Sequence, residues 1–105
     1  MTTNNKIIAE IKKTARSYIS DADIMLFGSR ARNEDSKESD FDILIITDQD
    51  ISPENKTPLR TSIRKDLLIS GIRTDILIQS RNEIEKKKRL PGHFIKNIMQ
   101  EAILL

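Results

Sequence analysis

The chain has 105 residues, which is enough for one small domain with one core and too few for a multidomain enzyme. Hydrophobic residues make up 37% of the sequence and charged residues 32%, and 18 Ile and 9 Leu suffice for a compact core rather than a disordered chain. The net charge is only +2. Residues 1–52 contain 7 basic and 10 acidic side chains, and residues 53–105 contain 11 basic and 6 acidic side chains. This uneven distribution is compatible with a phosphate ligand but is not by itself a nucleic-acid signature.

Several classes of protein are excluded by what the sequence lacks. It has no cysteine, which excludes disulfide frameworks, thiolate zinc sites and cysteine nucleophiles. Its longest unbroken apolar runs have four residues, far below the ~20 that a membrane helix needs. Met1–Asn5 is polar and uncharged and no apolar segment follows it, so we expect no signal peptide and a cytoplasmic protein.

The first half of the chain predicts one helix and two strands. Over Lys6–Ile19, apolar residues recur at helical spacing with basic residues on the opposite side, which predicts an amphipathic helix. Ile24–Phe27 is a short apolar run that ends at Gly28, and it predicts a buried strand. A second strand is predicted at Phe41–Thr47, where isoleucine is frequent.

A helix and a third strand are predicted next. Thr57 and Pro58 have the character of an N-cap and a first-turn proline, and Gly71 suits the end of a helix, so a helix is predicted between them. Ile72–Gln79 then predicts a strand, because it is again rich in isoleucine.

The last part of the chain predicts two helices. Ser80–Glu83 has the spacing of a capping box and starts a helix that runs through Lys86–Arg89. Leu90–Gly92 ends that helix, and a final helix is predicted from about His93 to the C-terminus. The order helix, strand, strand, helix, strand, helix, helix predicts one α/β domain over residues 1–105, with a small mixed β-sheet flanked by helices.

Three aspartates on the predicted strands are candidate metal ligands. Asp40 and Asp42 project from one face of a strand while Phe41 projects from the other, and two carboxylates that close repel unless a cation sits between them. Asp75 lies among isoleucines in the third strand, and it can join the pair if that strand lies beside the second. Three carboxylates without His or Cys predict a hard oxygen site for Mg²⁺ or Mn²⁺.

A candidate phosphate-binding turn follows the first strand. Gly28 lets the backbone approach a ligand closely, and the Ser29 hydroxyl with neighbouring N–H groups can hold phosphate oxygens. Arg30 and Arg32 add positive charge, either as phosphate contacts or as plain surface charge. A phosphate-binding turn next to a carboxylate cluster predicts a site for a nucleoside triphosphate.

These motifs together resemble a known family. Gly28-Ser29, ten further residues, Asp40-x-Asp42 and the later Asp75 resemble the nucleotidyltransferase superfamily that includes polymerase beta. The chain is similar in particular to its minimal, antitoxin-like members in bacteria and archaea. The resemblance implies the nucleotidyltransferase fold, with Gly28 and Ser29 binding the triphosphate, Asp40 and Asp42 holding the metals, and Asp75 completing the site and favouring deprotonation of the attacking hydroxyl.

The resemblance continues to the end of the chain, with two departures. Pro91–Ile98 together with Glu101 is similar to the last helix of the minimal members. Asn33 stands where many relatives have glycine, and asparagine tolerates the left-handed backbone that such a position requires. Ala102 replaces a glycine that is common near the end of these relatives.

The predicted function is transfer of a nucleoside monophosphate, AMP from ATP, to a hydroxyl acceptor with release of pyrophosphate. The resemblance implies a protein acceptor, because minimal members are commonly paired with a helical HEPN-type RNase toxin that some of them adenylylate. The alternative is a binding module that masks such a partner through the last helix without turnover. Nucleotide addition to RNA is a third interpretation, favoured only if the basic second half forms one continuous strip.

Two further features leave their role open. The run Lys86–Arg89 is interpreted as a solvated helix face rather than a phosphate or RNA patch. Eight of the twelve residues in Phe94–Leu105 are apolar, more than a surface helix normally buries. Core packing accounts for part of that face, and we assign the excess to a protein partner or a self-dimer.

Overall fold

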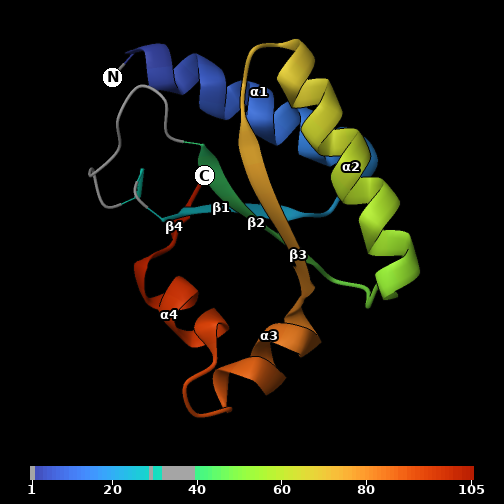
Figure 1. Ribbon diagram of the computed structural model, residues 1–105, viewed down its shortest axis with the longest axis vertical. Helices are drawn as coiled ribbons and strands as arrows, with labels where there is room; N and C mark the ends of the chain where they lie inside the picture. Colours follow the sequence, from blue (N-terminus) through green and yellow to red (C-terminus); the bar gives the residue numbers. More distant parts are fainter. Residues whose placement is uncertain (1, 29, 32–39) are drawn as a thin grey trace.

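A computed structural model describes residues 2–28, 30–31 and 40–105 of the chain. Figure 1 shows its elements in chain order, which are α1 (Thr2–Tyr18), β1 (Asp23–Phe27), β2 (Phe41–Thr47), α2 (Pro53–Ile69), β3 (Thr74–Ser80), α3 (Arg81–Lys88), α4 (Phe94–Glu101) and β4 (Ile103–Leu104). No helix in these described residues is both long and apolar enough to cross a membrane.

The four strands form one mixed sheet in the order β3-β2-β1-β4. Strand β2 lies inside the sheet, antiparallel to β1 and parallel to β3, and β4 is antiparallel to β1. Six of the seven residues of β2 are buried, which explains why this strand reads as a nearly continuous apolar run. The predicted small mixed sheet flanked by helices is therefore confirmed.

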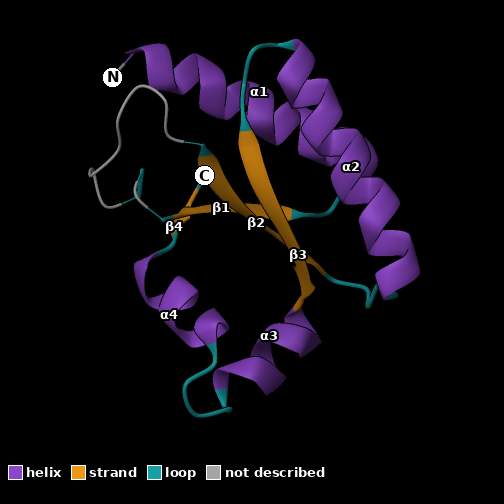
Figure 2. Cartoon of the chain, viewed as in Figure 1, coloured by secondary structure: helices purple, strands orange, loops and turns teal. Residues whose placement is uncertain are grey.

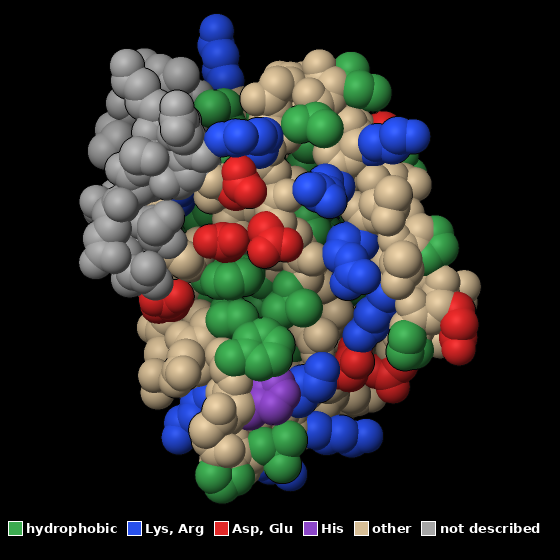
Figure 3. All heavy atoms as spheres, viewed as in Figure 1, with side chains coloured by type: hydrophobic (Ala, Val, Ile, Leu, Met, Phe, Trp, Pro, Cys, Tyr) green, Lys and Arg blue, Asp and Glu red, His purple; other side chains and the backbone are tan. Residues whose placement is uncertain are grey.

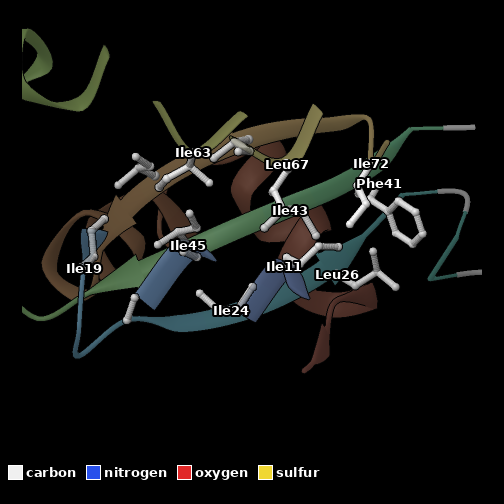
Figure 4. Close-up of a cluster of buried hydrophobic side chains, with 14 residues drawn as sticks. Ile11, Ile19, Ile24, Leu26, Phe41, Ile43, Ile45, Ile63, Leu67 and Ile72 are labelled. Carbon is white, nitrogen blue, oxygen red and sulfur yellow. The ribbon is translucent and has the colours of Figure 1, made fainter. Parts of the chain in front are cut away.

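The two faces of the sheet carry separate cores. Helices α1 and α2 cover one face and α3 and α4 cover the other (Figure 2). Side chains alternate along β2, so that Ile43 and Ile45 enter the first core while Leu44 and Ile46 enter the second. Figure 4 shows the first core, in which these isoleucines meet Ile11 of α1 and residues of α2. Polar residues that share a face with Leu44 therefore point toward α4.

The predicted start of α2 at Thr57 and Pro58 is wrong. Ser52 is the N-cap residue, Pro53 opens the helix, and the Lys56 N–H donates to the Ser52 carbonyl at 2.9 Å. Pro58 lies inside the helix, where it leaves the Glu54 carbonyl without its usual donor. Two prolines five residues apart both fit the first turn of a helix, and the earlier one takes that place.

The predicted end of α2 is confirmed. Gly71 has a φ of +80°, which glycine adopts without the steric cost of a Cβ. Its N–H donates to the Leu68 carbonyl and the Ile72 N–H donates to the Leu67 carbonyl, both at 2.9 Å. These two bonds satisfy carbonyls of the last helical turn and direct the chain into β3.

The final helix does not continue to the C-terminus as predicted. It ends at Glu101, Ala102 is extended, and Ile103 and Leu104 pair with β1 as strand β4. The Leu105 N–H donates to the Ile24 carbonyl at 2.9 Å. The edge of β1 offers backbone partners that a longer helix would leave unused, and the apolar end of the chain fits a strand as well as a helix.

Candidate active site

The carboxylates of two predicted site residues are brought together by the sheet. In the parallel pair β2–β3, Asp42 and Asp75 are register partners, so their side chains project from the same face. That face is the one covered by α4, where Asp42 is half-buried and Asp75 is exposed. The condition set by the sequence, that the strand of Asp75 lies beside the strand of Asp42, is therefore met.

Gly28 lies against the Asp42 carboxylate. It follows β1, whose last residue Phe27 is the antiparallel partner of Asp42. A Cβ built at Gly28 would lie 2.0 Å from Oδ2 of Asp42, and the φ of Gly28 is +76°. Both the backbone angle and the close approach require glycine at this position. The space that a Cβ at Gly28 would occupy is therefore taken by the Asp42 carboxylate.

Glu101 also reaches this turn, although the sequence did not mark it as a site residue. Its Oε1 accepts a hydrogen bond of 3.3 Å from the Gly28 N–H. Glu101 is the last residue of α4, so this bond connects the C-terminal helix to the end of β1. Its place in the C-terminal part of the family motif was the one signal that could have indicated it.

Asp40 lies one residue before β2 and contacts Arg73, the residue immediately before β3. Its Oδ1 is 3.4 Å from Nε of Arg73, and the Arg73 carbonyl accepts a bond from the Phe41 N–H at 3.0 Å. Both charged side chains are more than half exposed, and an ion pair of this kind contributes about 0–1 kcal/mol. Such a weak pair leaves the Asp40 carboxylate accessible to a stronger cation.

The remaining predicted residues belong to the segment after Gly28. The Arg30 guanidinium carbon lies 3.9 Å from the centroid of the Phe41 ring, a cation–π contact that holds its charge beside the start of β2. Ser29 and Arg32 lie outside the described residues, as does Asn33.

The aspartate oxygens at this end of the sheet suit a divalent metal. Asp42 and Asp75 offer oxygen ligands from one face, and carboxylate oxygens suit Mg²⁺ or Mn²⁺, which keep waters and phosphate oxygens in their other positions. In residues 2–28, 30–31 and 40–105, no group of three or more His, Asp or Glu is already gathered closely enough to hold a metal. The donor types fit such a metal, and Asp40 lies two residues before Asp42 at the same end of the sheet.

Two grooves meet at Asp75. One, of about 420 Å³, lies along α2, and the other, of about 240 Å³, lies toward α4. The first is lined by Asp75 with Arg60, Thr61, Arg64, Lys65, Leu68 and Ile76. The second is lined by Asp75 with Phe27, Ile76, Leu77, Phe94 and Ile98. Figure 3 shows acidic side chains in the middle of this face, with a row of basic side chains on one side and hydrophobic ones below.

Comparisons with known proteins agree with this architecture. A complex described as a toxin-antitoxin with AMP-PNP is similar to the chain, with a TM-score of 0.61, 16% identity, and coverage of 91% of this chain and 69% of the other. A candidate minimal nucleotidyltransferase is similar with a TM-score of 0.56, 24% identity, and coverage of 99% and 93%. At these identities the two structures show a shared fold.

The sequence itself matches a family model. No curated protein matches the chain. The model described as a nucleotidyltransferase domain matches residues 8–105, which include the Gly28 turn and all three aspartates. The chain therefore belongs to the nucleotidyltransferase domain family.

Proposed function

We propose that this protein transfers AMP from ATP to a hydroxyl group on a partner protein and releases pyrophosphate. The observation that carries the proposal is the pairing of Asp42 with Asp75 across β2–β3, with Gly28 packed against Asp42. The family supports nucleotidyl transfer in general. The nucleotide, the acceptor and the residue roles below are our proposal.

The reaction forms one bond and breaks one at the α-phosphorus. The acceptor oxygen attacks the phosphorus, the bond to the oxygen that bridges the α- and β-phosphates breaks, and pyrophosphate leaves with that electron pair. Asp40, Asp42 and Asp75 would hold Mg²⁺ or Mn²⁺, which when bound supplies charge neutralisation for the phosphates and acidifies the acceptor hydroxyl. Asp75 favours removal of the hydroxyl proton, because its exposed carboxylate is accessible from the α2 groove.

The chain's own backbone positions the triphosphate. Gly28 has no side chain to block the approach of phosphate oxygens, and the proposal places the Ser29 hydroxyl as a donor to them. Arg30, held over Phe41 at the start of β2, supplies positive charge near the site, and the proposal gives Arg32 the same role. Holding the triphosphate in line with the acceptor reduces the entropic cost of the reaction.

Two observations support ATP and a protein partner. A fold neighbour is a toxin-antitoxin complex with AMP-PNP, an ATP analogue. The surface near the C-terminus leaves large apolar side chains exposed, since Phe94 is 52%, Ile103 48% and Leu104 62% exposed. A HEPN-type toxin is the partner that we propose, on the strength of the resemblance to minimal nucleotidyltransferases.

The same apolar surface favours a second candidate function. A protein that masks its partner without turnover would need the exposed apolar residues at Phe94 and β4 and would not need Asp75. The two candidates therefore differ in which residues neutralise the partner.

Intact-mass measurement tests the proposal. The purified chain is incubated with ATP, Mg²⁺ and the product of the neighbouring gene, and a mass gain of one AMP on the partner is expected. Asp42→Asn should abolish the gain while its fold is retained, because the amide removes the charge but hardly changes the shape. A partner that is bound and neutralised at unchanged mass would establish masking instead.

A further inference from the structure

Helix α2 presents basic side chains to the groove beside Asp75. Arg60, Arg64 and Lys65 line the 420 Å³ groove, and their spacing of four and five residues places them along one side of the helix. Leu68 and Ile76 supply its apolar part.

The groove has three basic side chains and one acidic one, Asp75, among its described lining residues. Within the described residues, Arg64 and Lys65 make no ion pair, and neither does Asp75. Four other cations are paired with carboxylates, namely Lys56, Arg73, Arg81 and Lys88. Arg60 has only a 3.4 Å contact to the Thr57 hydroxyl. The groove therefore keeps an excess of positive charge facing solvent.

The order of the strands determines where the groove lies relative to the proposed triphosphate position. Asp42 on β2 lies between Gly28 at the end of β1 and Asp75 on β3. With the triphosphate at Gly28, as the proposed function has it, the α2 groove lies across Asp42 from the phosphates. The attacking oxygen must approach from the side opposite the leaving pyrophosphate, which in this arrangement is the Asp75 side, where the α2 groove opens.

We propose that Arg60, Arg64 and Lys65 bind the acceptor, and that the acceptor hydroxyl lies in an acidic segment of the partner protein. The inference rests on the proposed function for the direction of attack. Glutamate or aspartate next to the modified residue would pair with the groove cations and hold the hydroxyl at Asp75.

The charge distribution favours an acidic protein segment over RNA. The other basic run, Lys86–Arg89, lies at α3, under the opposite face of the sheet from α2 (Figure 1). There Lys88 is paired with Glu85, and Lys87 donates to Gln79. Two cations of that run therefore already have partners within the described residues, and apolar Leu68 in the α2 groove suits a peptide.

Charge reversal with a matched control tests the inference. Arg64→Glu and Lys13→Glu each change the charge by the same amount at an exposed position of a helix, and Lys13 lines neither groove at Asp75. Binding is measured by fluorescence anisotropy to three labelled probes of equal length, a Glu–Tyr copolymer, a Lys–Tyr copolymer and single-stranded RNA. Melting temperatures check that each variant folds, and Mg²⁺–ATP affinity is measured alongside because Arg64 also lines a groove with Asp40.

The wild-type chain is expected to bind the Glu–Tyr probe best. Arg64→Glu should weaken that binding about tenfold or more at low salt, while Lys13→Glu retains it. Binding is measured without nucleotide, so an inactive protein with a working groove is distinguished from a failed groove. Equal losses in both variants, or no loss in Arg64→Glu, would overturn the proposal. Tighter binding of RNA than of the Glu–Tyr probe, lost in Arg64→Glu, would assign the groove to a nucleic acid instead.

Discussion

Charged side chains lie at both ends of the parallel pair β2–β3, but in different arrangements. At the C-terminal ends, called the closed end below, acidic side chains are hydrogen-bonded to neighbouring side chains, whereas at the N-terminal ends two carboxylates lie next to each other. At the C-terminal ends of the strands, Arg81 donates to Asp48 at 2.8 Å and to Asp23 at 2.7 Å. Ser80 donates to Asp50, and Lys56 donates to Glu83. At the N-terminal ends, Asp42 and Asp75 project side by side, and Asp75 makes no ion pair among the described residues.

The contacts at the closed end stabilise the start of α3. Ser80 caps α3, since its hydroxyl accepts from the Glu83 N–H at 3.1 Å while its own N–H donates to the Glu83 carboxylate at 2.9 Å. The Arg81 hydrogen bond lowers the pKa of Asp48, and the Ser80 hydrogen bond lowers the pKa of Asp50. Burial alone would raise the pKa of Glu83, but hydrogen bonds from Lys56 and Ser80 lower it below its usual range.

The contrast teaches where chemistry can occur in this fold. Carboxylates that are already matched by cations stabilise the connection from β3 to α3 and have no remaining capacity for a ligand. Two carboxylates placed next to each other repel, and this repulsion favours the binding of an added cation. We therefore expect the chemical reaction at the N-terminal ends of β2 and β3. Substitutions at the closed end serve as control variants.

The largest effect is expected from Asp75→Asn. The amide keeps the shape of the strand but cannot take the acceptor proton, so transfer of AMP should fall by about a hundredfold or more. Asp48→Asn at the closed end should leave the transfer rate unchanged. Rates are measured by intact mass, and binding of the partner is measured by co-purification. If Asp75→Asn still neutralises the partner fully in cells, masking is the function.

Two glycines with nearly the same backbone angle give the next comparison. Gly28→Ala places a methyl group on the Asp42 carboxylate, so it should remove most of the rise in melting temperature that Mg²⁺ with ATP produces. Gly71→Ala has the same kind of strain at φ +80° but nothing within 4 Å of the new Cβ. It should cost about 1 kcal/mol of stability and leave the nucleotide effect intact. Equal nucleotide effects in both variants would contradict the proposed triphosphate position.

A smaller effect is expected from Ser29→Ala. Loss of one charge-assisted hydrogen bond should weaken ATP binding by about 1 kcal/mol or more in calorimetric titration, with the melting temperature of the free protein unchanged. Ser17→Ala is the matched control, because the Ser17 hydroxyl donates to the Thr14 carbonyl within α1, away from the site. Equal affinity in the Ser29 variant and the wild type would reduce Gly28-Ser29 to a structural turn.

The smallest effect concerns acid stability at the closed end. The pKa of Asp48 is lower in the folded chain than its unfolded value of about 3.9, so its contribution is present above that pH and is lost as the pH falls further. Arg81→Met should therefore reduce the loss of stability between about pH 5 and pH 2. Arg64→Met, which removes a cation without an ion pair among the described residues, should not. Urea unfolding at several pH values measures both slopes, and parallel slopes would contradict the assignment.

Much of the fold could be predicted because local signals were unambiguous. The bounds of β2 follow from the apolar run after Phe41, and the capping box at Ser80 starts α3 as predicted. The start of α2 was ambiguous because two prolines satisfy the same local rule. Strand β4 forms because the edge of β1 is available for pairing. That availability depends on the tertiary structure, so the four-residue apolar run at the C-terminus could not predict it.

The candidate site was predictable in its residue types but not in its arrangement. The sequence marked Asp42 and Asp75, whereas their register depends on pairing between strands that α2 separates. The α2 groove was missed because exposed basic residues on an amphipathic helix have the same pattern as an ordinary solvated face. Glu101 was missed as a contact because its partner, the Gly28 N–H, is 73 positions away in the chain.

The parallel pairing of β2 with β3 also has a consequence for how the chain folds. Strands β1 and β2 are antiparallel, and they can pair before the rest of the protein has been synthesised. Strand β3 can join β2 only after the whole of α2 has been made. Pairing between segments so distant in sequence is slow compared with local helix formation. The Asp42–Asp75 pair is thus completed late, so that binding of nucleotide through both carboxylates should report on chains that have finished folding.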